Sequence, residues 1–196
     1  MKNQNNSILK FYIREMIREM SSLDNKLYVF DFDDTLVKTD ALVGITDVST
    51  GDKKWLTPGQ YATHEKADTE HFDFSQFDDL INPKSISWTK RILKNVYDKR
   101  GPGATAVLTA RGHESNEKIQ NFLNSLGLTG IEIITLGSSN PQDKADWIEQ
   151  QINSRNLTEV EFFDDSHKNV SAVAKLKQKY PNIKIISRHI VHKKQF

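Results

Sequence analysis

The sequence contains no cysteine, which excludes disulfide bonds, thiolate metal sites and cysteine nucleophiles. It also lacks any apolar run near the roughly 18–20 residues that cross a bilayer, and its N-terminus has no continuous apolar core typical of a signal peptide. The net charge is only +1, so no overall field favours nucleic acid. These absences predict a cytoplasmic protein with no membrane partner.

The chain is long enough for one globular domain with a small insertion, having 196 residues of which 37% are hydrophobic. We assign this domain to residues 26–196 and expect a helix and a connector in residues 1–25. Between Ile8 and Met20, apolar residues recur at helical spacing opposite a face of Lys, Arg and Glu. This amphipathic helix is expected to dock on its own domain, and the alternative is self-association or binding to a partner.

Short apolar runs alternate with helical patterns through the rest of the chain. The runs are rich in Val, Ile, Leu and Phe on both faces, which is typical of buried parallel strands. The predicted strands are Leu27–Phe32, Ala104–Thr109, Ile131–Leu136, Val160–Asp164 and Ile183–Ser187. The predicted helices are Ile86–Lys99, Glu114–Leu126, Pro141–Ile152 and Ser166–Tyr180. This pattern predicts an α/β fold of three layers around a mostly parallel, five-stranded sheet.

One connection is far longer than usual and is predicted to form a small cap at about 41–84. "VGITDV" and "KKWL" flank "STGD", which favours a β-hairpin, and Thr57 followed by Pro58 is typical of a helix start. The segment "FDFSQFDDLINP" reads as irregular. The aromatic residues of this insertion are expected to form its own small core, and the alternative is that they stack on a base or ring of a ligand; they are Trp55, Tyr61, Phe72 and Phe74.

Polar side chains follow the predicted strands at the edge where open parallel sheets bind ligands. They are Asp31, Asp33 and Asp34 after the first strand, Thr109 and Arg111 after the second, Lys144 near a helix start, and Asp164 and Asp165 after the fourth. Carboxylates this close repel one another, so we expect a cation to bind among them. Because the ligands are all oxygen, Mg²⁺ suits them.

Four short motifs occur in order over roughly residues 26–187: "DFDDTL", "LTAR", the lysine of "PQDK" and "FFDD". They are similar, in the same order, to the four motifs of the haloacid dehalogenase superfamily, which the chain therefore resembles. Most members are Mg²⁺-dependent phosphatases with a Rossmann-like core. The "TAR" arginine and the compact layout also resemble the phosphatase domain of polynucleotide kinase-phosphatases, which remove 3′-phosphates.

The resemblance implies a role for each motif residue. Asp31 is similar to the nucleophile that forms an aspartyl-phosphate, and Asp33 to the general acid and base. Thr109 resembles the hydroxyl that binds the phosphoryl oxygens, and Lys144 the lysine that screens their charge. The implied substrate contacts are Thr109, Ala110 and Arg111, and the implied Mg²⁺ ligands are Asp31, Asp33 (through its carbonyl), Asp164 and Asp165.

Three of these assignments have alternatives in the sequence itself. Lys168 competes with Lys144 for the role of the motif lysine. Asp165 would serve equally as a cap for the helix that starts at Ser166. Arg111 either binds a substrate phosphate or pairs with an acidic neighbour.

The predicted function is that of a Mg²⁺-dependent phosphomonoesterase. Its partner would be a phosphorylated small molecule, such as a nucleotide or sugar phosphate, or a nucleic-acid end carrying a 3′-phosphate. The alternative is a non-catalytic binding or assembly protein that retains the fold and works through its N-terminal helix.

Overall fold

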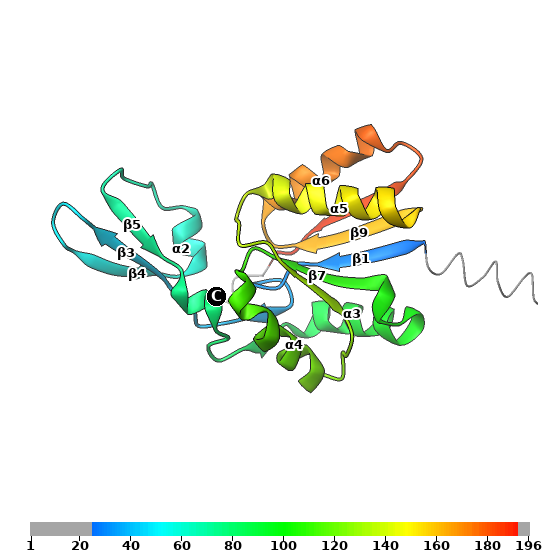
Figure 1. Cartoon of the computed structure of the whole chain (residues 1–196), viewed down its shortest axis with the longest axis horizontal. Coiled ribbons are helices and arrows are strands. Elements are labelled where there is room, and N and C mark those ends of the chain that lie inside the picture. Colours follow the sequence, from blue (N-terminus) through cyan, green and yellow to red (C-terminus); the bar gives the residue numbers. More distant parts are fainter. Residues whose placement is uncertain (1–24, 192–196) are drawn as a thin grey trace, which may run out of the picture.

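The computed structural model of the chain describes residues 25–191 and contains a central parallel sheet with helices on both sides (Figure 1). The sheet has five strands in the order β10-β9-β1-β7-β8, and every neighbouring pair is parallel. The strands are β1 (Lys26–Phe30), β7 (Thr105–Thr109), β8 (Glu132–Thr135), β9 (Glu159–Asp164) and β10 (Lys184–His189). The α/β class and the parallel five-stranded sheet predicted from the sequence are therefore confirmed.

Helices cover the two faces of this sheet in pairs. Figure 1 shows α5 (Pro141–Arg155) and α6 (His167–Lys179) on one side, and α3 (Ser87–Arg100) and α4 (Asn116–Ser125) on the other. Alternate residues of β1 explain the layers, because neighbouring side chains of a strand point to opposite faces. Leu27 and Val29 pack with the buried side chains of α5 and α6, whereas Phe30 packs with those of α3 and α4. Each face thus has its own apolar core.

Helix ends follow the capping signals of the sequence. The Asn140 side chain accepts a hydrogen bond from the Gln142 amide (3.1 Å) at the start of α5, with Pro141 as the first helical residue. Gly127, just after α4, has φ +74°, a conformation that glycine adopts without strain. The short η2 (Pro102–Ala104) and η3 (His113–Ser115) are 3₁₀ helices beside β7 and α4. Lys144 is thereby placed in the first turns of α5.

The insertion forms a separate small sheet beside the core, which we call the cap (Figure 1). Its strands are β3 (Val43–Asp47), β4 (Lys53–Leu56) and β5 (Glu70–Asp73), in the order β4-β3-β5. It also contains the short helix α2 (Pro58–Ala62) and η1 (Ser75–Asp78). The strand pair β2 (Val37–Lys38) and β6 (Lys84–Ser85) closes its base. The predicted hairpin is β3–β4, and Thr57 caps α2 by accepting from the Gln60 amide (3.3 Å).

Two expectations from the sequence are corrected. The segment read as irregular begins inside β5, which pairs antiparallel with β3. This strand is short and its exposed face is polar, so its apolar signal is weak. The first strand ends at Phe30 rather than Phe32, because the Leu36 and Val37 amides both donate to the Phe32 carbonyl and turn the chain.

The predicted N-terminal helix lies outside the described residues, and so does any surface that it would use for self-association. Within residues 25–191, no helix is both long and apolar enough to cross a membrane.

Candidate active site

The acidic turn lies directly after β1, at the carboxyl end of the sheet. The Asp31 amide donates to the Phe163 carbonyl (2.8 Å), so the ladder to β9 continues one residue beyond the strand. Asp34 then adopts φ +52°, a left-handed conformation that aspartate tolerates better than most residues. The turn closes when the Asp34 amide donates to the Val37 carbonyl (2.8 Å). Asp31 and Asp33 are thereby fixed on either side of Phe32.

Lys144 lies at the centre of the site. Its Nζ is 2.6 Å from Asp31 Oδ1 and 2.7 Å from Asp164 Oδ2, and the side chain is buried. Lys168, its competitor in the sequence, is exposed on α6. The structure therefore brings Lys144, rather than Lys168, to the carboxylate at position 31. A single ammonium bridges the ends of β1 and β9.

Asp164 is fully buried and held by several donors. Besides Lys144, the Ser166 amide donates to its Oδ1 (2.8 Å), and Asn169 Nδ2 approaches both oxygens at 3.1 and 3.0 Å. The carboxylate that accepts from the backbone at the start of α6 is thus Asp164, and not Asp165 as one interpretation of the sequence had it. Asn169 lies five positions after Asp164, so this partner carries no strong sequence signal.

Three carboxylates gather around the ammonium. Oxygen atoms of Asp31, Asp164 and Asp165 all lie within 4.8 Å of one another. Burial raises the pKa of Asp31 well above its usual range, although Lys144 opposes this. Burial and the charge of Asp164 raise the pKa of Asp165 to about 6. Burial alone would lower the pKa of Lys144, but Asp31 and Asp164 outweigh it and raise that pKa.

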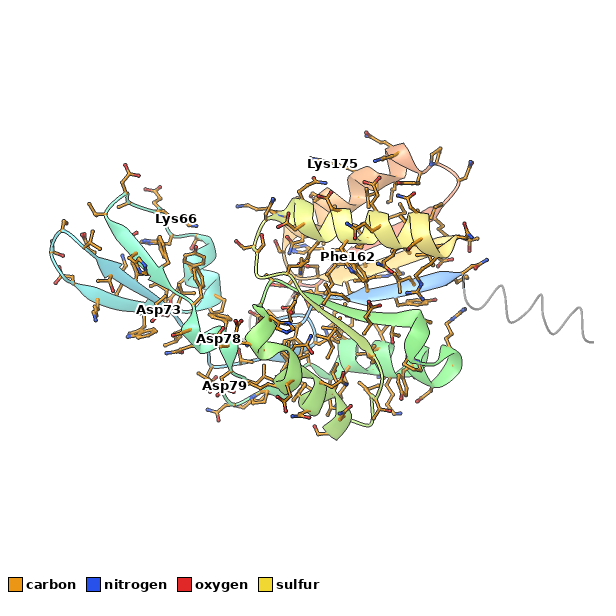
Figure 2. All side chains as sticks on the ribbon, viewed as in Figure 1. Lys66, Asp73, Asp78, Asp79, Phe162 and Lys175 are labelled. Carbon is orange, nitrogen blue, oxygen red and sulfur yellow. The ribbon has the colours of Figure 1, made fainter. Side chains whose placement is uncertain are left out.

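Arg111 forms a buried bridge between Asp33 and the cap. Its Nε and Nη2 donate to the two Asp33 oxygens, both at 2.8 Å, in the bidentate geometry that arginine favours. Its Nη1 donates to the main-chain carbonyls of Phe77 (2.5 Å) and Asp79 (2.7 Å). Of the two interpretations of Arg111, pairing with an acidic neighbour is the one that the structure shows. Asp78 and Asp79, labelled in Figure 2, lie where the cap meets the core.

Threonine hydroxyls fix the surrounding backbone. Thr109, the last residue of β7, is buried and accepts from the Arg111 amide (3.2 Å), while Ala110 between them is exposed. The sequence analysis missed two others: Thr35, which accepts from the Asp165 amide (3.1 Å), and Thr89, which donates to the Thr35 carbonyl (2.5 Å). A threonine on an otherwise amphipathic helix such as α3 gives little sign of such a contact.

The predicted site residues thus converge at the carboxyl edge of the sheet. Asp31, Asp164 and Asp165 form one group around Lys144, and Asp33 lies beside it with its carboxylate bound to Arg111. Comparison of the chain with protein-family models, with curated proteins and with solved structures finds no match.

Proposed function

We propose that the protein is a Mg²⁺-dependent phosphomonoesterase of the haloacid dehalogenase type. The observation that carries the proposal is the bridge from Lys144 to Asp31 and Asp164, which unites three of the four motifs that the sequence shares with that family. Burying a lysine among carboxylates is unfavourable even when the charges are paired. Such an arrangement is therefore a candidate functional site.

The donor set fits a magnesium ion. Asp31, Asp164 and Asp165 with Lys144 carry a net charge of −2 when ionised, which one divalent cation would balance. One oxygen from each of these carboxylates lies within 4.8 Å of the others, so the three could contact one cation, and oxygen ligands suit Mg²⁺. The Asp33 carboxylate is bound by Arg111, so the contribution of Asp33 would be its carbonyl, as the resemblance implies. A bound Mg²⁺ would offset negative charge on the phosphoryl oxygens.

Asp31 would act as the nucleophile. One of its oxygens bonds to phosphorus while the ester bond to the leaving group breaks, giving an aspartyl-phosphate and an alkoxide. Lys144 would hold Asp31 in position and screen its charge as the phosphoryl group approaches. The Thr109 hydroxyl, at the end of the neighbouring strand β7, would donate to a phosphoryl oxygen.

Asp33 would carry the proton. It gives a proton to the leaving alkoxide, then takes one from the water that attacks the phosphoryl group, releasing phosphate and restoring Asp31. Both Asp33 oxygens accept from Arg111 in this structure, so one of these two bonds must break before Asp33 can carry the proton that it gives to the alkoxide. The remaining bond would keep Asp33 oriented toward the leaving group.

Phosphate release in the presence of Mg²⁺ tests this proposal. Nucleotides, sugar phosphates, phosphopeptides and 3′- or 5′-phosphorylated oligonucleotides form the substrate panel. We expect release that EDTA abolishes and that Asp31→Asn lowers by on the order of 10⁴-fold or more. Asparagine retains an oxygen for Lys144, so the variant should fold.

The matched control is Asp52→Asn, which alters an exposed carboxylate in the β3–β4 turn and should leave the rate unchanged. Release from no substrate class by folded protein would contradict the proposal and favour a binding role. Equal rates for the wild type and Asp31→Asn would contradict the assigned nucleophile.

A further inference from the structure

A cavity of about 470 Å³ lies between the cap and the core beside Asp33. Tyr61, Phe74 and Phe77 line it from the cap, and Asp33 and Arg111 line it from the core. We call this cavity the aromatic pocket. Its volume is within the range of small-molecule sites, roughly 300–1,000 Å³. Because it reaches Asp33, it is where the leaving group of a phosphate ester would lie.

The cap side of the pocket is a cluster of aromatic rings. Tyr61 contacts Phe74 edge to face with ring centroids 5.4 Å apart, and Phe74 lies 6.5 Å from Phe77. Tyr61 also packs edge to face on Phe72, a half-buried residue of β5. Tyr61, Phe72 and Phe74 thus cluster as the sequence predicts, but Trp55, which was predicted to join them, is 50% exposed. Tyr61 and Phe74 of this cluster also line the pocket.

Phe74 is the ring in this cluster that is most exposed. It retains 45% of its accessible surface, whereas burial of a phenylalanine is normally favourable by roughly 1.5–3 kcal/mol. Trp55 and Trp88 are exposed too, but neither lines this pocket. An exposed aromatic side chain beside a catalytic group has a use if a planar ligand stacks on it.

The charges of the pocket disfavour a second anionic group. Arg111 is the only basic residue that lines it in the described part of the chain, and Asp33 and the Phe77 and Asp79 carbonyls already use its donors. Asp78 adds another carboxylate to the lining. A neutral group therefore suits this cavity better than a further phosphate.

Polar groups also line the cavity. Ser138 and Ser139, from the segment after β8, contribute to the lining, and Ser139 is exposed. Hydroxyl and carboxylate groups at the edge of an apolar pocket are suited to bind the ring nitrogens and exocyclic amino groups of a planar heterocycle. The combination of stacking surface and polar edge distinguishes a nucleobase from a purely apolar ring.

We propose that the aromatic pocket binds the nucleobase of the substrate, which is a nucleoside carrying the phosphate to be removed. This inference rests on the proposed phosphomonoesterase function and names its substrate class. The nucleoside is either a free mononucleotide or the terminal nucleotide of an oligonucleotide, since both present the same base and phosphate.

The test is calorimetric titration of the Asp31→Asn protein, which cannot turn over substrate, with Mg²⁺ present. Adenosine 3′- and 5′-monophosphate are compared with ribose 5-phosphate, which has no base. We expect at least one nucleotide to bind about 5- to 100-fold more tightly than ribose 5-phosphate, as base stacking predicts. An oligonucleotide with a terminal phosphate forms the third arm, and tighter binding there identifies a nucleic-acid end as the source.

Phe74→Leu keeps the apolar volume but removes the ring. We expect it to abolish most of the difference in binding affinity between nucleotide and ribose 5-phosphate. Trp55→Leu, which lies on the cap but outside the pocket, should leave that difference unchanged. Equal binding of ribose 5-phosphate and both nucleotides, or a preference unchanged by Phe74→Leu, would overturn the inference. Wild-type protein with EDTA provides a second preparation that does not depend on the folding of Asp31→Asn.

Phosphate release from acetyl phosphate, which has no ring, separates this inference from the proposed function. Release from acetyl phosphate without any preference for a base would overturn the inference and leave the phosphatase standing. A preference for the base without release from any ester would overturn the phosphatase and support the pocket as a nucleoside site.

Discussion

Replacing Arg111 with methionine should destabilise the protein strongly and loosen the cap. The Arg111 side chain is 1% exposed, and its guanidinium makes two bonds to Asp33 and two to main-chain carbonyls of the cap. Methionine has similar length but no donor, so it leaves those acceptors without partners. Breaking a buried ion pair costs roughly 3–5 kcal/mol. Because Asp33 is 26% exposed and water can reach it, we expect the lower end, about 3 kcal/mol.

Urea unfolding and thermal melting measure this change. For a domain of this size, about 3 kcal/mol corresponds to a fall in Tm of roughly 6–12 °C. Lys118→Met is the matched control, because Lys118 also joins the core to the cap, through the Asp78 carbonyl (2.8 Å), but is 44% exposed. It should cost no more than about 1 kcal/mol. Equal destabilisation by the two variants would refute the argument that the buried Arg111 bridge holds the cap.

Three further predictions follow from individual contacts. Lys144→Met should cost about 3–5 kcal/mol in urea unfolding and abolish phosphate release, because it leaves buried carboxylates unpaired, whereas the exposed Lys168→Met should do neither. Thr89→Val should cost about 1–3 kcal/mol by the same assay, since the buried carbonyl that its hydroxyl contacts loses a donor; no change would show that the contact is dispensable. The hydrogen bond from Lys54 lowers the pKa of Glu70 to about 2, so the stabilisation by ionised Glu70 is complete above about pH 4.3 and is lost as pH falls toward 2. The Tm difference between the wild type and Glu70→Gln should therefore shrink from pH 5 to pH 2, and a constant difference would contradict this.

The sheet was predictable from the sequence because its central strands β1 and β7 are largely buried. Apolar residues such as Val29 and Val107 dominate these strands, and this pattern can be recognised without knowledge of the neighbouring strands. Helix starts at Pro58 and Pro141 were also predictable, because the capping residue and the proline are adjacent in the sequence. The location of the polar site residues at the carboxyl edge of the sheet was predictable too, because all five strands are parallel.

What the sequence could not reveal depends on contacts between distant residues. Lys144 lies 113 positions from Asp31, and the choice between Lys144 and Lys168 needed the packing of α5 against the sheet. The pairing of Arg111 with Asp33 likewise depends on where the cap returns to the core. The strand β5 was missed because it is a short edge strand whose exposed face is polar, so its alternation is hard to separate from a loop.

The most direct test of the account is the covalent state of Asp31 during turnover. Wild-type protein mixed with Mg²⁺ and a substrate that it cleaves would be quenched in acid, digested and analysed by mass spectrometry. The account predicts one added phosphoryl group on the peptide that contains Asp31, and its absence in Asp31→Asn. Phosphate release that continues in Asp31→Asn, with no phosphoryl group on that peptide in the wild type, would contradict the account.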